Sequence, residues 1–186
     1  MFTEEFFTHH HLFFCKEDIW LKTLLRLHVS SVFTNDREFK VQSVLKLRQS
    51  SVYKTLKLSP ETVETNLLHD SSVSLVSFVA LASLYNVNVA VVTGNLCIFT
   101  KNSEPSHFVD VSGSIRPIPA SKFEELYRIL LVGKPLNALS YYTVSDLETM
   151  TRKLRLPKGS KSLMYNGIQH YIHSKITALP VKTKKN

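Results

Sequence analysis

Residues 71–100 read SSVSLVSFVALASLYNVNVAVVTGNLCIFT, and this stretch decides the fold class. Its first half is apolar on more than one side of a helical wheel, which is typical of a helix buried in a core. Asn86 is the predicted stop for that helix, because asparagine tolerates the left-handed conformation that ends many helices. The β-branched residues 87–92, the turn signal Thr93-Gly94-Asn95 and the returning residues 96–100 predict a β-hairpin.

Helices are predicted on the N-terminal side of this unit. The apolar spacing over residues 16–29 indicates an amphipathic helix. Residues 37–56 predict a single helix with Val41 and Leu45 among its inward side chains and Lys40 on a basic outer face. Ser59 and Pro60 then begin a short helix, since a serine cap followed by proline is a common start.

Beyond the hairpin, residues 107–111 alternate as a third strand, and residues 123–132 predict a further helix. The expected fold class is therefore α+β: a helical body with a small β-hairpin or three-stranded sheet, followed by a helical C-terminal unit. We expect a mixed body over residues 1–133, a helical unit over 134–179 and a basic tail over 180–186.

Composition excludes several classes of protein. The 186 residues are 44% hydrophobic and 20% charged, which is ordinary for a globular protein, and no apolar run approaches the roughly 20 residues of a membrane span. The chain has no phosphate loop, no dinucleotide-binding glycine pattern, no HExxH and no EF-hand, so no cofactor is expected. Its two cysteines, Cys15 and Cys97, make no zinc spacing, so we expect no metal site and a reducing compartment.

The net charge of +8 is confined to one end of the chain. Residues 1–133 contain 13 Lys and Arg and 13 Asp and Glu, whereas residues 134–186 contain 10 Lys and Arg but only Asp146 and Glu148 as acids. The composition changes at Gly133-Lys134-Pro135. Such an asymmetry predicts a polyanion-facing end on an electrically neutral body.

The C-terminal unit is predicted to be two short helices. Thr143 is the cap of the first, with Asp146 at the third position as an acidic variant of the capping box. Ser160 can cap a second helix that continues to residue 173. The predicted inner faces are Leu147, Met150 and Leu154 on the first helix, and Leu163, Ile168, Tyr171 and Ile172 on the second. Because this core is small, we expect the unit to rest on the body or on a partner.

The pattern of this unit resembles a SAP-type helix–turn–helix. It reads Ser145-Asp146-Leu147 … Leu154-Arg155-Leu156-Pro157 … Gly159-Ser160-Lys161 … Leu163 … Ile168 … Tyr171-Ile172. The resemblance implies DNA binding, largely through backbone contacts, by a basic helix start and linker. One departure is that Met164-Tyr165-Asn166 lacks the charged residues usual at that place.

The order of motifs along the whole chain resembles an uncharacterised protein family of nucleocytoplasmic large DNA viruses. The motifs are Leu12-Phe13-Phe14-Cys15, a basic helix over residues 39–57, Tyr85-Asn86-Val87-Asn88-Val89, and Lys134-Pro135-Leu136 … Ser140-Tyr141-Tyr142 before the SAP-like end. The resemblance implies a viral protein carried in the virion, with viral structural proteins as partners. During infection it would lie in the host cytoplasm or nucleus.

The first functional hypothesis is therefore a non-enzymatic virion-associated protein that contacts DNA or another polyanion. Its candidate phosphate contacts are Arg152, Lys153, Arg155, Lys158, Lys161, Lys175, Lys182, Lys184 and Lys185. The same charge would also serve solubility, or an acidic protein surface in a shell. A capsid component whose phenylalanine-rich N-terminus docks on a neighbouring subunit is a related alternative.

The second hypothesis is a papain-like cysteine hydrolase, either a peptidase or a deubiquitinase. Cys15 precedes a predicted helix, where a thiolate is stabilised, and His107 with Asp110 lies well downstream. No family signature surrounds Cys15, and His107 and Asp110 would point to opposite faces of one strand. A degenerate papain-like fold reused as a scaffold in residues 1–133 would reconcile the two hypotheses.

Overall fold

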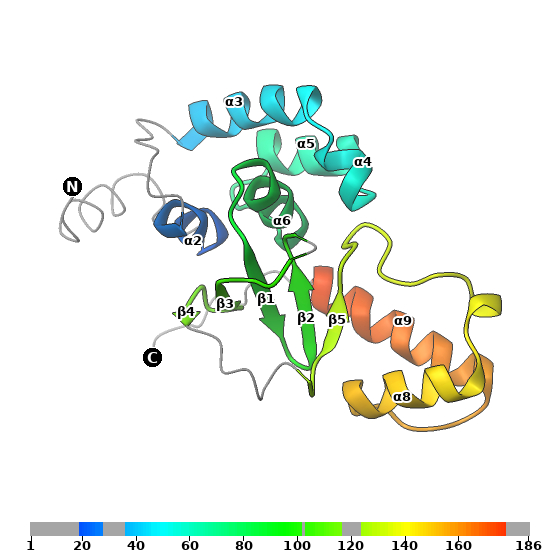
Figure 1. The fold of residues 1–186 in the computed structure, drawn as a ribbon. Helices are drawn as coiled ribbons and strands as arrows, with labels where there is room; N and C mark the ends of the chain where they lie inside the picture. The colour runs from blue at the N-terminus through cyan, green and yellow to red at the C-terminus, as the bar shows by residue number, and fades with distance from the viewer. Residues whose placement is uncertain (1–18, 28–35, 102, 117–123, 178–186) are drawn as a thin grey trace.

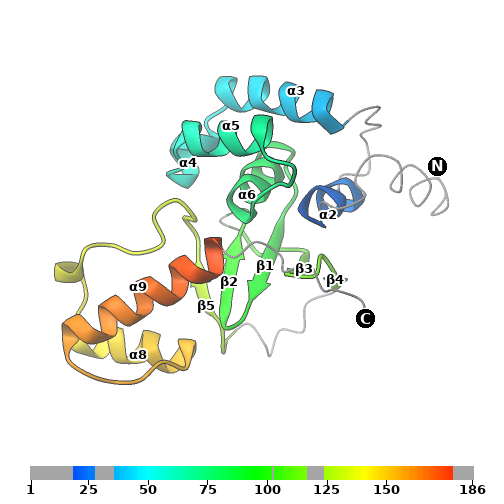
Figure 2. The same ribbon diagram turned by 180° about the vertical axis from the view of Figure 1, so that it is seen from behind.

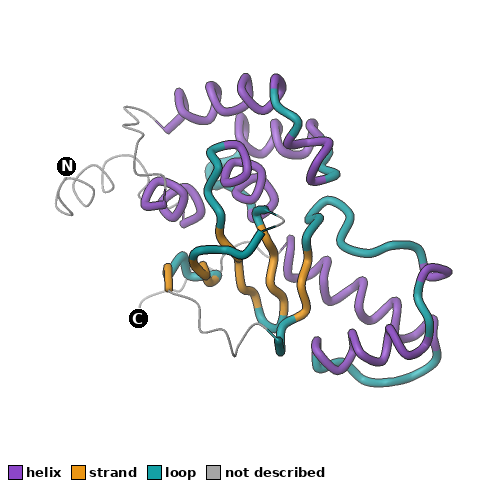
Figure 3. Tube along the Cα trace, viewed as in Figure 1, coloured by secondary structure: helices purple, strands orange, loops and turns teal. Residues whose placement is uncertain are grey.

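The protein has an α+β fold built on a five-stranded mixed sheet (Figures 1 and 2). The computed structural model describes residues 19–27, 36–101, 103–116 and 124–177. Helices gather at one end of the sheet, and two C-terminal helices extend past its β5 edge, with the end of the last helix lying against the sheet (Figures 2 and 3). The predicted α+β class is confirmed.

The N-terminal helical layer surrounds one apolar helix. Its members are α2 (Ile19–Leu27), α3 (Asp36–Gln49), α4 (Val52–Leu56), α5 (Pro60–His69) and α6 (Leu75–Leu84). The Ser59 hydroxyl accepts from the N–H of Thr62 at 3.4 Å, so the predicted cap of α5 is confirmed. At the end of α6, Asn86 has a φ of 61° and the N–H of Val87 donates to the carbonyl of Ala82 at 2.7 Å. These are the features of a Schellman motif, and Asn86 is the predicted stop.

The sheet has the strand order β4-β3-β1-β2-β5. The strands are β1 (Val89–Thr93), β2 (Leu96–Phe99), β3 (His107–Asp110), β4 (Ile115–Arg116) and β5 (Tyr127–Ile129). β1 and β2 pair antiparallel with Thr93 opposite Leu96, which confirms the predicted hairpin and leaves Gly94 and Asn95 as a two-residue loop. β3 runs parallel to β1 and β5 parallel to β2, whereas β4 pairs antiparallel with β3.

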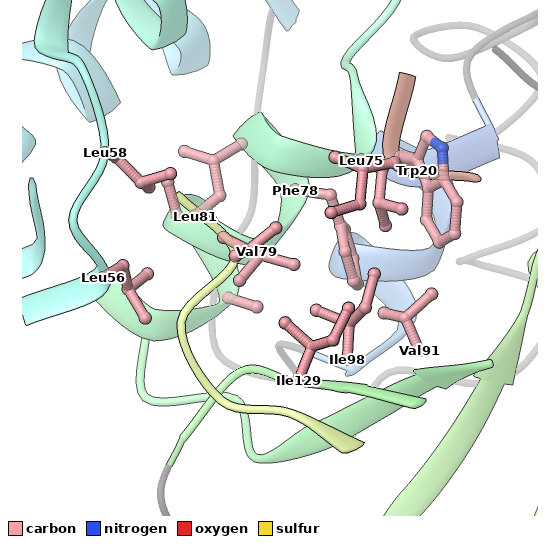
Figure 4. Packing of buried hydrophobic residues seen from close by; sticks show 14 of the residues in the cluster. Trp20, Leu56, Leu58, Leu75, Phe78, Val79, Leu81, Val91, Ile98 and Ile129 are labelled. Atoms are coloured by element: carbon pink, nitrogen blue, oxygen red, sulfur yellow. The ribbon is translucent and has the colours of Figure 1, made fainter. Parts of the chain in front are cut away.

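The main core lies between one face of the sheet and the helices (Figure 4). The rings of Trp20 and Phe78 lie 4.9 Å apart between centroids, and Ile98 and Ile129 come up from the sheet beneath them. The same continuous cluster includes apolar side chains of α8 (Val144–Leu154) and α9 (Lys161–Thr177). The C-terminal helices therefore share their core with the body.

The single helix predicted over residues 37–56 is in fact two helices, α3 and α4. The Ser50 hydroxyl donates to the carbonyl of Leu47 at 2.8 Å and accepts from the N–H of Val52 at 3.2 Å. A serine side chain that bonds the local backbone in this way competes with the helical hydrogen-bond ladder. The chain consequently turns between Gln49 and Val52.

The buried face of α3 also differs from the prediction. Val41 and Leu45 are 39% and 46% exposed, whereas Lys40 is only 6% exposed. Phe39 and Val44, which the same pattern predicts to face inward, are buried, and Leu47 is buried beside them. The stem of Lys40 is buried and its Nζ donates to the carbonyl of Asp70 at 3.4 Å, so this lysine belongs to the packed side of the helix.

The helix predicted over residues 123–132 is wrong for the described residues 124–132. Tyr127–Ile129 forms strand β5, paired parallel with β2. The outer edge of β2 offers unpaired backbone groups, and this short segment satisfies them while burying Ile129 at 2% exposure. The sheet therefore has five strands rather than the expected three.

The segment predicted as a domain boundary is packed against α4. The N–H of Gly133 donates to the carbonyl of Leu56 at 3.2 Å. A Cβ atom at Gly133 would lie 2.0 Å from the carbonyl oxygen of Lys57, so only glycine fits this approach.

In the described part of the chain, no helix has both the length and the apolar character that a membrane crossing needs.

Gly133→Ala should destabilise the protein by about 1–3 kcal/mol, because the backbone of α4 must move to admit the methyl group. Gly167→Ala is the matched control. It lies inside α9 with no atom within 4 Å of an added Cβ, so it should stabilise by about 0.5–1 kcal/mol. Urea unfolding followed by circular dichroism measures both; equal effects of the two substitutions would contradict the close approach at Gly133.

Candidate functional site

The first C-terminal helix, α8, begins with the predicted capping box. The Thr143 hydroxyl accepts from the N–H of Asp146 at 3.1 Å, and the Asp146 carboxylate accepts from the N–H of Thr143 at 2.8 Å. The bond from the Thr143 N–H, with the one from its hydroxyl, lowers the pKa of Asp146. Leu147, Met150 and Leu154 are buried as predicted.

α8 ends in a left-handed residue that is not glycine. Arg155 has a φ of 57°, and the N–H of Leu156 donates to the carbonyl of Thr151 at 2.8 Å. This Schellman motif fixes the backbone of Arg155 just beyond the last turn, which carries Arg152 and Lys153. Cations at this position are also favoured by the helix dipole.

The second helix, α9, runs beside α8 in the same direction. Figures 1 and 2 show the linker of residues 155–160 returning along α8 to the start of α9. Ile168 and Ile172 are buried as predicted, but Leu163 is 62% exposed rather than inward-facing. Leu163 instead lies over the linker, because a Cβ at Gly159 would be 2.7 Å from its Cδ2.

The loop of the β1–β2 hairpin joins both helices to the sheet. The Asn95 side-chain Nδ2 donates to the carbonyl of Leu154 at 3.2 Å, at the end of α8. The backbone N–H of Asn95 donates to the Tyr171 hydroxyl of α9 at 3.2 Å. A Cβ at Gly94 would lie 2.7 Å from that hydroxyl and 3.4 Å from Cε of Lys175. One two-residue turn therefore contacts both the C-terminal end of α8 and the last two turns of α9.

The chain around these contacts carries four cations, which we together call the basic end. Its members are Arg152, Lys153, Arg155 and Lys175. Arg152 and Arg155 are exposed, and Lys153 and Lys175 are half-buried. The Lys175 Nζ lies 5.5 Å from the centroid of the Tyr171 ring. Among the described residues, no carboxylate forms a salt bridge with any of the four.

Two other predicted phosphate contacts face the unit's own acids. The Lys158 Nζ lies 3.9 Å from a carboxylate oxygen of Glu148. Lys161 lies close enough to Asp146 for its charge to contribute to the lowered pKa of that carboxyl. Both lysines are therefore partly neutralised within the unit. Lys182, Lys184 and Lys185 lie outside the described residues, as does the whole predicted tail over residues 180–186.

The residues proposed for cysteine hydrolysis are not assembled by the described chain. Cys15 lies outside it, together with the aromatic segment over residues 1–14. His107 is exposed, with its Nδ1 at 3.1 Å from the Ser106 hydroxyl. Within residues 19–27, 36–101, 103–116 and 124–177, no group of three His, Cys, Asp or Glu side chains is placed to hold a metal ion.

Asp110 serves the β3–β4 turn rather than His107. Its Oδ1 accepts from the N–H of Ser112 at 2.8 Å, from the Ser112 hydroxyl, and from the N–H of Ser114 at 3.1 Å. Partial burial acts to raise the pKa of Asp110, but these hydrogen bonds outweigh it and the pKa is lowered. Asp110 is therefore a turn-forming residue, and the predicted role of orienting His107 has no support in its contacts.

Asn95 is the positioning residue that the sequence does not reveal. The residues around Asn95 indicate only a hairpin turn. The two partners of Asn95, Leu154 and Tyr171, lie far away in the chain. The sequence gives one indirect indication: Tyr171 is predicted to face inward, so its ring and its hydroxyl need a partner in the fold.

Cys97 should not react with Ellman's reagent in the folded protein at pH 8. Burial raises the pKa of its thiol to about 12, so the thiolate needed for attack is scarce, and the side chain is 0% exposed. In a Cys15→Ser variant, thiol release should stay near zero until urea unfolds the chain and then reach one thiol per chain. A fast-reacting thiol in the native variant would contradict the burial of Cys97, while a highly reactive Cys15 in the unmodified protein would support the hydrolase hypothesis.

Comparison of the chain with protein-family models, curated proteins and solved structures gives no significant match. Function must therefore be inferred from the geometry and charge of this chain.

Proposed function

We propose that the chain is a non-enzymatic protein that binds a polyanion, duplex DNA in the first instance, at the basic end. The observation that carries the proposal is that the chain around the Gly94–Asn95 turn contacts on α8 and α9 carries four cations, and none of them forms a salt bridge with a described carboxylate. The body, residues 1–133, contains equal numbers of basic and acidic residues. The attraction for an anion is therefore expected at the C-terminal unit.

The expected binding is electrostatic and has little sequence preference. Lysine and arginine side chains at helix ends contact phosphates, and such contacts position a protein on DNA without reading bases. Four phosphate contacts would give a slope of about −3.6 in log K against log salt concentration. The affinity would then fall about a hundredfold between 50 and 200 mM salt. Lys158 and Lys161 should add less, because Glu148 and Asp146 offset their charge.

The virion placement is a further part of the proposal and rests on the resemblance in the sequence. A protein of a large DNA virus that binds DNA without catalysis would be packaged with the genome and with viral structural proteins. Immunoblotting of purified particles, treated with protease before and after disruption, tests this directly. The chain should be protected in intact particles and degraded in disrupted ones; its absence from particles would overturn the placement while leaving DNA binding to be judged by the experiment below.

The variant Arg152→Gln/Lys175→Gln should bind a 20-base-pair duplex about 10- to 100-fold more weakly at 100 mM salt. It removes one cation from each helix of the basic end, so the slope of log K against log salt should become shallower by about 2. Fluorescence anisotropy over a salt series gives both quantities.

The matched control is Lys46→Gln/Lys54→Gln, which removes the same charge from the electrically balanced body. It should leave the salt slope unchanged and weaken binding only slightly. The proposal fails if both double variants lose affinity equally, since binding would then follow net charge alone. It also fails if the unmodified protein shows no salt-dependent binding.

A further inference from the structure

One helix presents an apolar stripe to solvent at the outer edge of the protein. α3 forms that edge in both ribbon views, with no described element on its outer side (Figures 1 and 2). Val41 and Leu45 lie one turn apart on it and are 39% and 46% exposed. Leu68, on the neighbouring helix α5, is also 40% exposed. α3 and α5 run antiparallel, because Lys40 bonds Asp70 at one end and Arg48 bonds Glu64 at the other.

A charged residue lies beyond each end of this stripe, at a helical spacing that places it on the same side of α3. Glu38, Val41, Leu45 and Arg48 are separated by three, four and three residues, which places them along one seam of the helix. We call these four residues the α3 seam. Glu38 is exposed and makes no salt bridge with another described residue. Arg48 uses Nε and Nη2 on Glu64, which leaves Nη1 for another acceptor, and its side chain remains 58% exposed.

The seam is complementary to itself. A two-fold axis at the level of Ser43, perpendicular to the helix, pairs α3 antiparallel with α3 of a second copy. Glu38 then lies opposite Arg48 of the second copy, and Val41 lies opposite Leu45. Both pairs occur twice, as an isologous interface requires. A parallel pairing would instead place like charges against each other.

We propose that the α3 seam is a homodimer interface, formed by antiparallel packing of α3 on α3 of a second copy. Apolar contacts at the centre and a cross-subunit Glu38–Arg48 pair at each end give the interface its register. The helix has only 14 residues, so the buried area is modest and the dimer should dissociate on dilution. The inference does not depend on the proposed DNA binding, although a dimer would carry two basic ends and bind longer duplexes with higher avidity.

Sedimentation equilibrium of the full chain tests the dimer. The weight-average mass should rise with concentration from the monomer value of 21.2 kDa toward twice that value. Leu45→Asp should hold the mass at the monomer value over the same range, because it buries a charge at the centre of the seam. Leu163→Asp is the matched control, an exposed leucine on α9, and should dimerise as the unmodified protein does.

A monomeric unmodified protein overturns the proposal, and so does a dimer that survives Leu45→Asp or is lost equally in Leu163→Asp. The melting temperature of each variant, followed by circular dichroism, shows whether the fold persists. If Leu45→Asp unfolds the chain, Glu38→Lys replaces it, since this substitution sets like charges at both ends of the seam. Dimerisation unaffected by Glu38→Lys would then overturn the proposed register.

Cysteine cross-linking tests the antiparallel orientation. In the proposed dimer, Glu38 of one copy lies next to Gln49 of the other, whereas position 38 is about 15 Å along the helix from its own counterpart. A mixture of Glu38→Cys and Gln49→Cys chains should therefore form a disulfide-linked dimer under mild oxidation. Each variant alone should give no more cross-linked dimer than the unmodified protein does with its own cysteines. Equal cross-linking in the single variants and in the mixture would contradict the orientation.

Discussion

The contact between the Gly94–Asn95 turn and the two C-terminal helices fixes the position of the chain that carries Arg152, Lys153, Arg155 and Lys175. Asn95 donates to the Leu154 carbonyl of α8 through its side chain and to the Tyr171 hydroxyl of α9 through its backbone. Gly94 is needed beside it, because its φ is 59° and an added Cβ would meet the tyrosine hydroxyl. The turn thus aligns the ends of two helices whose last turns contribute Arg152, Lys153 and Lys175.

Helix polarity explains why the cations gather there. The turn meets α8 at its C-terminal end and α9 within its last two turns, and the partial negative charge of a helix C-terminus favours nearby lysine and arginine. Part of the positive charge therefore stabilises the protein itself. The summed charge of the four cations exceeds the two partial dipole charges, and this excess remains available to an anion. Near the opposite ends of the helices, Asp146 and Glu148 instead lie close to Lys161 and Lys158.

Local signals in the sequence predicted the elements whose ends are marked by specific residues. Thr143 with Asp146, Ser59 and Asn86 each identify a helix boundary through backbone chemistry that operates within a few residues. Elements fixed by distant partners were not predictable. The segment at Tyr127–Ile129 has the apolar content of a helix, and only the open edge of β2 makes it a strand.

The same limit applies to side-chain direction and to the candidate site. On α3, apolar residues lie on two sides, and the contact with α5 decides that Val44 is buried while Leu45 is exposed. The charge excess of the C-terminal residues was visible in composition. Its division was not: the sequence does not reveal which cations lack a carboxylate partner among the described residues and which face Glu148 and Asp146, because these contacts form only in the folded chain.

Backbone amide NMR of the full chain during titration with a short DNA duplex tests the central claim most directly. If the basic end binds DNA, the largest shift changes should fall on Arg152, Lys153, Arg155 and Lys175, with a smaller change at Asn95, which is bonded to both helices. Residues of the α3 seam should not move at low duplex concentration. Changes centred on the body, or spread evenly over all exposed lysines and arginines, would contradict the account.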